Sequence, residues 1–181
     1  KFKNQAFHVS TISWKNCEIS DLVRTMWYQE VDADQKQIAD NIVIEDCRFL
    51  GLNSGGSGLF GLSTKQDAPV HNFVFKNSTF HANNLTRALI TGLGSMTGEL
   101  NVTIENCTFE GNVKASRSDV AAIQTIDTCT ISKCINNVDC VNFGDAYVAG
   151  LAIKANNSNI TDCENNGDFS IDTIKELEAN K

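Results

Sequence analysis

The stretch VTIENCTFEGN, residues 102–112, contains two short runs of alternating apolar and polar residues with an asparagine between them. Val102 and Ile104 are the apolar residues of the first run, and the second run leads to Phe109. Alternation with a period of two is typical of a β-strand with one buried face. Asparagine adopts the left-handed backbone conformation more readily than other non-glycine residues. The stretch therefore predicts two strands joined by a sharp corner at Asn106.

The same phrase recurs along the chain. Four copies share the order apolar, any, apolar, charged, Asn or Asp, Cys or Ser, any, apolar, and they are ISWKNCEI (12–19), IVIEDCRF (42–49), FVFKNSTF (73–80) and VTIENCTF (102–109). Their Cys or Ser positions are 30, 31 and 29 residues apart. Two further copies are predicted in TIDTCTI (125–131), with Cys129 in that position, and in IKANNSNI (153–160), with Ser158 there. Repetition at this length indicates a solenoid of stacked, similar units.

Among the solenoid classes, only a β-helix fits these copies. Leucine-rich repeats need a leucine-rich consensus that is missing here, and propeller blades need about 40 residues. In a β-helix, successive coils stack roughly 4.8 Å apart, so equivalent residues form columns. The predicted inner columns are apolar throughout, and they are Ile12, Ile42, Phe73, Val102; Trp14, Ile44, Phe75, Ile104; and Ile19, Phe49, Phe80, Phe109, Ile131, Ile160. The outer column before the corner is Lys15, Glu45, Lys76 and Glu105, whose opposite charges alternate as neighbouring strands prefer.

We therefore predict an all-β, right-handed parallel β-helix of about six coils, as one domain over residues 1–166. The corner residues would stack and form hydrogen bonds between their side chains, and they are Asn16, Asp46, Asn77, Asn106 and Asn157. The long-loop side of the solenoid would consist of residues 21–40, 52–70, 82–99 and 138–150. Residues 167–181 are predicted to be a short C-terminal helix or a tail, because Ile171, Ile174 and Leu177 follow helical spacing.

Composition narrows the function classes. The net charge is −7 and no Lys/Arg-rich run occurs, which argues against a nucleic-acid partner. No apolar run approaches the roughly 18 residues that a membrane-spanning helix needs. The seven cysteines form no close C-x-x-C pair of the kind that binds zinc, and we interpret the stacked ones as small buried thiols. The chain opens within the repeat pattern and without an initiator Met, which predicts that it is a fragment of a longer chain.

The phrases IVIEDCRFLGL, FVFKNSTFHAN and VTIENCTFEGN resemble the coils of pectin-lyase-like right-handed β-helices. They resemble more closely the chondroitinase-B-like modules of unknown function in secreted or surface proteins of Bacteroidetes, over roughly residues 10–166. This resemblance implies a secreted or cell-surface protein that is associated with polysaccharide. Lyases of the family use an outward Lys/Arg pair on neighbouring rungs, together with calcium held by Asn and Glu. Those residues do not map onto this chain motif by motif.

Three residues are candidates for lyase chemistry. A β-elimination site needs a base for the proton next to the uronate carboxylate and a cation for that carboxylate. Arg48 could supply the cation, although it could instead pair with Glu18 in the same outer column. Lys76 is the second candidate, and it could instead pair with the glutamates of its own column. His81 could act as acid or base, or it could be an isolated surface histidine.

Two further candidate sites lie in residues 21–40, which we call the first variable segment. Glu30, Asp32 and Asp34 could offer oxygen ligands to calcium, or could form a solvated acidic loop. Trp27 and Tyr28 could stack on sugar rings, or could pack over the first coil. The leading prediction is a non-catalytic, carbohydrate-associated module with no cofactor, calcium being the alternative. A polysaccharide lyase or its degenerate remnant, and an adhesin-like structural spacer, are the other function hypotheses.

Overall fold

The structure is a computed structural model, and it describes residues 9–21, 27–31, 39–52, 60–64, 71–85, 88–91, 100–115, 121–127, 129–144 and 147–171. These residues form strands β1 to β18 and no helix. None of them therefore belongs to a helix that could cross a bilayer. The predicted all-β class is confirmed for this part of the chain.

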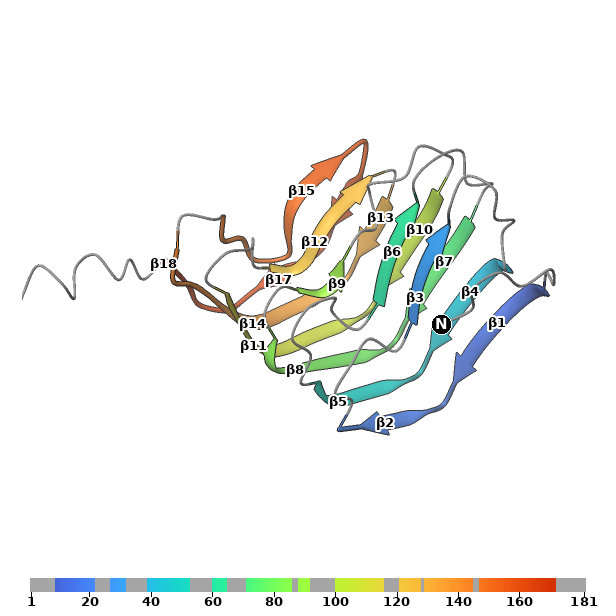
Figure 1. Ribbon diagram of the computed structural model, residues 1–181, viewed down its shortest axis with the longest axis horizontal. Helices are drawn as coiled ribbons and strands as arrows, with labels where there is room; N and C mark the ends of the chain where they lie inside the picture. Colours follow the sequence, from blue (N-terminus) through green and yellow to red (C-terminus); the bar gives the residue numbers. More distant parts are fainter. Residues whose placement is uncertain are drawn as a thin grey trace, which may run out of the picture.

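The strands belong to three parallel sheets that together form a solenoid. Sheet A consists of β1 (Val9–Lys15), β4 (Ala39–Glu45), β7 (His71–Lys76), β10 (Leu100–Glu105), β13 (Cys129–Ser132) and β16 (Asn159–Thr161). Sheet B consists of β2 (Glu18–Ser20), β5 (Arg48–Leu52), β8 (Thr79–Leu85), β11 (Thr108–Ala115), β14 (Ile135–Asn142) and β17 (Glu164–Asn165), with β18 (Phe169–Ile171) also paired to β14. Sheet C consists of β3 (Trp27–Val31), β6 (Phe60–Thr64), β9 (Ala88–Thr91), β12 (Ala121–Asp127) and β15 (Ala152–Asn156). Successive coils stack from β1 at one end to β18 at the other (Figure 1).

The predicted parallel β-solenoid is thus confirmed, but the described residues do not form six complete turns. Sheet A has six strands whereas sheet C has five, so the last coil has no strand of sheet C in the described residues. Strand β18 extends sheet B past the predicted domain boundary at residue 166. The rest of the predicted tail, residues 172–181, lies outside the described residues.

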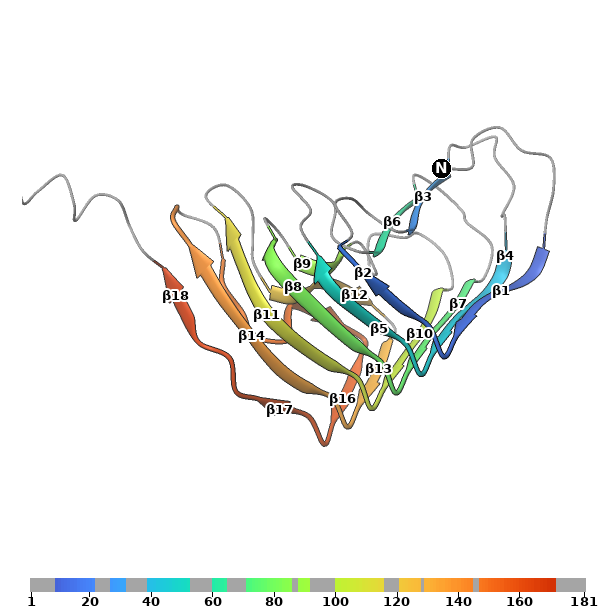
Figure 2. The same ribbon diagram turned by 90° about the horizontal axis from the view of Figure 1, so that it is seen from below.

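The chain turns from sheet A to sheet B at one residue with a positive φ in every coil. These residues are Asn16 (52°), Asp46 (55°), Asn77 (49°), Asn106 (53°), Lys133 (54°) and Asp162 (53°). Figure 2 shows the corner, with β1, β4 and β7 on one side and β2, β5 and β8 on the other. The predicted stacking of side chains is present here, since Asn106 Nδ2 donates to Asn77 Oδ1 at 2.9 Å and Asn77 Nδ2 donates to Asp46 Oδ1 at 3.1 Å.

The prediction that Asn157 belongs to this column is wrong. Asn157 also has a positive φ, of 46°, but it lies between β15 and β16, where the chain passes from sheet C to sheet A. Glu105 pairs with Ser132, and Ser132 pairs with Thr161, so the residues that follow, Lys133 and Asp162, continue the corner column. The corner from sheet A to sheet B and the corner from sheet C to sheet A both combine an apolar alternation with a polar turn residue. Only the register of the strands distinguishes the two corners.

The same register corrects the predicted positions of the last two copies. Cys129 pairs with Val102 inside sheet A, so it does not follow Cys107 in the Cys or Ser column. That column continues instead with Cys134 and Cys163, which come directly after the corner residues. Ile131 pairs with Ile104, and Ile160 pairs with Ile131. These two isoleucines therefore extend the inner column of Trp14, Ile44, Phe75 and Ile104 in sheet A, and not the column of Phe109 in sheet B.

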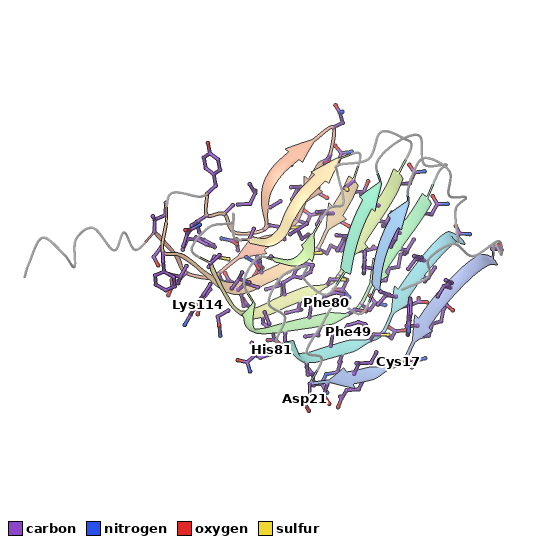
Figure 3. The ribbon with its side chains drawn as sticks, in the orientation of Figure 1. Cys17, Asp21, Phe49, Phe80, His81 and Lys114 are labelled. Carbon is purple, nitrogen blue, oxygen red and sulfur yellow. The ribbon has the colours of Figure 1, made fainter. Side chains whose placement is uncertain are left out.

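Stacked aromatic rings form the centre of the core. Phe49 and Phe80 have ring centroids 5.3 Å apart with planes at 2°, and Phe80 and Phe109 have centroids 5.4 Å apart with planes at 15°. All three rings are fully buried on the inner face of sheet B, where Figure 3 labels Phe49 and Phe80. The next residue of the column is Asn136, which is also buried and donates from Nδ2 to Asn165 Oδ1 at 2.7 Å. Because the Asn136 amide has a hydrogen-bond partner, it can follow the aromatic column in the core without leaving a buried polar group unpaired.

We predict that Asn106→Ala destabilises the fold more than Asn106→Gly does. Alanine at this φ of 53° costs about 1–2 kcal/mol of strain, and the lost bond to Asn77 adds about 1 kcal/mol. Glycine adopts the left-handed conformation freely, so only the lost bond and the higher chain entropy of the unfolded state remain. Urea unfolding of the three proteins measures the difference. Equal losses in both variants would show that backbone strain at the corner is unimportant.

Candidate functional site

Arg48 is engaged in an ion pair on the outer face of sheet B. Its Nη1 lies 2.7 Å from Glu18 Oε2, and the two side chains are 62% and 57% exposed. Glu18 and Arg48 are paired residues of neighbouring strands, as their 30-residue separation in the repeat predicts. The alternative interpretation of Arg48, a surface ion pair, is therefore the one that the geometry matches.

Lys76 lies in an ion ladder, which we define as the outward charged residues at the end of sheet A and at the adjoining corner. Lys76 Nζ lies 3.3 Å from Glu105 Oε2, and Lys133 Nζ lies 3.6 Å from Glu105 Oε1. Lys15 Nζ lies 2.7 Å from Glu45 Oε2. The hydrogen bond from Lys76 lowers the pKa of Glu105, and the bond from Lys15 lowers the pKa of Glu45. The predicted alternation of charge therefore brings opposite charges into contact in two groups, Lys15 with Glu45, and Glu105 with Lys76 and Lys133.

His81 lies on the outer side of sheet B, one residue after the buried Phe80 (Figure 3). It pairs with Glu110 on the next strand, whereas Arg48 pairs with Thr79, two residues before His81. Lys76 lies beyond the corner, in sheet A. The three lyase candidates therefore occupy three different columns, and only Arg48 and His81 share a face.

The candidates of the first variable segment are only partly described. Trp27, Tyr28 and Glu30 belong to β3, and their backbones pair with Phe60, Gly61 and Ser63 of β6. Their side chains, and Asp32 and Asp34 altogether, lie outside the described residues. Sugar stacking and calcium binding at this segment therefore stay predictions. In the parts of the chain that are described, no group of three or more His, Cys, Asp or Glu side chains could hold a metal ion.

A feature that we did not predict lies on the outer face of sheet A. Asn72 Nδ2 donates to Asn41 Oδ1 at 2.9 Å, and Asn101 Nδ2 donates to Asn72 Oδ1 at 3.3 Å. Asn41 Nδ2 donates in turn to the Ser10 carbonyl oxygen at 3.1 Å. We call Asn41, Asn72 and Asn101 the amide ladder. Its signal was in the sequence, since an asparagine directly precedes the apolar alternation in NIVIE, NFVFK and NVTIE.

The amide ladder faces outward and has unused hydrogen-bonding capacity. Asn41 and Asn72 are half-buried and Asn101 is exposed, whereas the next residue of each strand is buried. A primary amide has two N–H donors and an oxygen with two lone pairs. Among the described residues, Asn72 uses one N–H and one lone pair within the ladder, so one donor and one acceptor have no partner there.

Next to the amide ladder runs an uncharged column two residues further along each strand. It contains Val43, Val74 and Thr103, which pair with one another across β4, β7 and β10 and are half-buried. The ion ladder follows two residues later. The outer face of sheet A thus presents an amide column, an uncharged column and a self-neutralised charged column, side by side.

Comparisons with family models, with curated proteins and with solved structures find no match to this chain. The resemblance to pectin-lyase-like and chondroitinase-B-like coils therefore stays a prediction from the repeated phrases.

The seven cysteines are free thiols. Those after the corner donate to the carbonyl oxygen two residues earlier, as Cys47 Sγ does to Glu45 at 3.2 Å and Cys134 Sγ does to Ser132 at 3.3 Å. Cys140 is fully buried in β14, and burial raises the pKa of its thiol from 9.0 to about 12. It is therefore a protonated core group at neutral pH and no candidate nucleophile.

We predict that Cys140 makes the stability fall at alkaline pH. Its stabilising contribution is complete below about pH 9, where the unfolded thiol titrates, and is lost as the pH rises towards the folded pKa of about 12. One such proton contributes up to about 1.4 kcal/mol per pH unit in that window. Cys140→Ala should flatten the pH dependence of the unfolding free energy.

The buried neighbour Val138 gives the matched control, because Val138→Ala removes core volume from the same strand without removing a titrating group. The control should keep the wild-type slope although it lowers the stability. Identical slopes for Cys140→Ala and the wild type would contradict the assignment.

Proposed function

We propose that this chain is a non-catalytic, carbohydrate-binding module of a secreted or cell-surface protein, and that it binds through the outer face of sheet A. The amide ladder is the observation that carries the proposal. Each sugar hydroxyl both donates and accepts hydrogen bonds, and the unused donor and acceptor of Asn72 provide both kinds of partner.

Rigidity supports this choice of surface. The strands of sheet A pair in register, so neighbouring amides are held at a spacing of about 4.8 Å. Bonds within the amide ladder fix the side chains before a ligand arrives, which reduces the entropy lost on binding. Val43 and Val74 lie beside the amides and offer apolar contact to the C–H faces of sugar rings.

The ion pairs favour this proposal over a polysaccharide lyase. A lyase needs a cation for the substrate carboxylate, but Arg48 contacts Glu18 and Lys76 contacts Glu105. A structural spacer would require uniformly polar outer columns, and the column of Val43 and Val74 departs from that pattern.

A glycan array probed with the purified chain tests the proposal, with calcium and with chelator. We expect binding to a defined polysaccharide and a loss of about tenfold or more in the variant Asn72→Ala/Asn101→Ala, because each lost hydrogen bond is worth about 1 kcal/mol. Thr79→Ala, on the outer face of sheet B, is the matched control and should bind as the wild type does.

Absence of binding to every glycan would refute the module hypothesis and favour the spacer. Binding that both variants retain would move the site away from sheet A. Binding that needs calcium would instead direct attention to Glu30, Asp32 and Asp34.

A further inference from the structure

We propose that the glycan is uncharged and N-acetylated, and that its acetamido groups stack along the amide ladder. This inference rests on the proposed function and specifies its ligand. It starts from the direction of the hydrogen bonds: Nδ2 of each asparagine donates to Oδ1 on the preceding coil, from Asn101 to Asn72 and from Asn72 to Asn41. The ladder is thus a stack of parallel amides with one common orientation.

The spacing of this stack matches that of secondary amides. Trans amides that are joined by N–H···O=C bonds repeat at about 4.7–4.9 Å, as neighbouring strands of a sheet do. An acetamido group is a trans secondary amide with one donor and one acceptor that point in opposite directions. A row of acetamido groups from hydrogen-bonded neighbouring chains of the polymer can therefore follow the ladder in register, coil by coil. Hydroxyl groups alone do not impose such a repeat.

The uncharged column beside the amide ladder suits the methyl group of an acetamido substituent. Val43 and Val74 lie two residues along the strand from Asn41 and Asn72, which is about 7 Å, on the same face. An acetyl methyl group that lies next to its own amide can contact these side chains. This contact distinguishes an acetylated sugar from its hydroxylated counterpart through buried apolar area.

Charge excludes the acidic polysaccharides from this face. The amide ladder and the column of Val43, Val74 and Thr103 carry no charge, so these residues offer no cation to bind a uronate or sulfate group. The nearest cations on the face, Lys15 and Lys76, contact Glu45 and Glu105. An uncharged polymer of N-acetylated sugars avoids the cost of leaving an anion unpaired against this surface.

Chitin and cellulose provide a matched pair of ligands, because they share the same linkage and differ by an acetamido group in place of a hydroxyl. We expect the chain to sediment with chitin and to bind cellulose at least about tenfold more weakly, the difference that roughly 1.4 kcal/mol of lost contacts gives. Deacetylated chitin, assayed at a pH that keeps its amino groups uncharged, should behave like cellulose.

Two variants locate the binding on the protein. Asn72→Ala removes the central amide, and Val74→Glu places a charge in the neighbouring column; each should reduce sedimentation with chitin by about tenfold or more. Arg48→Gln, on sheet B, should leave it unchanged. Thermal unfolding monitored by circular dichroism confirms that each variant is folded, and Val74→Glu keeps the test valid if Asn72→Ala does not fold.

The outcomes separate this inference from the proposed function. Equal binding to chitin and cellulose, lost in Asn72→Ala, would overturn the acetamido specificity and leave the module hypothesis standing. Chitin binding that both sheet A variants retain would overturn the inference, because the contact would then lie elsewhere. No binding to either polymer or to any glycan of the array would overturn both.

Discussion

Parallel hydrogen bonding in register, continued through the corner between sheets A and B, is the constraint on which the rest of the structure depends. The N–H of the corner residue in each of the first five coils donates to the coil that follows it, as Asn77 does to the Glu105 carbonyl at 3.1 Å and Asn106 does to the Ser132 carbonyl at 3.0 Å. Two residues beyond the corner, the N–H of Thr108 donates back to the Ser78 carbonyl at 2.9 Å. The backbone ladder therefore resumes two residues after the corner, which keeps neighbouring coils in register.

Fixed register brings equivalent side chains of successive coils into contact. The side chains of each column therefore have to be compatible with copies of themselves or with their replacements on the neighbouring coils. Aromatic rings stack in the core, as Phe49, Phe80 and Phe109 do, because the coil spacing is close to the spacing that offset rings prefer. Charged residues alternate in sign, because like charges on paired strands would repel. The one serine among the cysteines after the corner, Ser78, fits because its hydroxyl donates to the Lys76 carbonyl at 2.7 Å and accepts from the Cys47 N–H at 3.1 Å.

The sequence predicted the strand register correctly where a copy of the repeat carried several independent signals. The four regular copies combine apolar alternation, a corner residue and alternating charge, so their columns and the pair Glu18–Arg48 could be predicted. It failed at the last two copies, because the two kinds of corner look alike in sequence. Lys133 gave no signal at all, since lysine has no preference for the positive φ of 54° that it adopts. The register of β13 alone identifies it as a corner residue.

The amide ladder was overlooked because it lies one position before the repeated template, yet it differs in kind from the other asparagines. Asn77 and Asn106 are needed where the backbone adopts a positive φ, and Asn136 is buried with its amide partnered. Asn41, Asn72 and Asn101 lie in extended strands on an outer face, where β-branched residues are favoured and asparagine is depleted. Neither backbone geometry nor core packing requires amides at these positions. Their repetition on three successive coils lets each amide bond to its neighbour, which stabilises the stack, and the same amides supply the outward donors and acceptors on which the proposed binding rests.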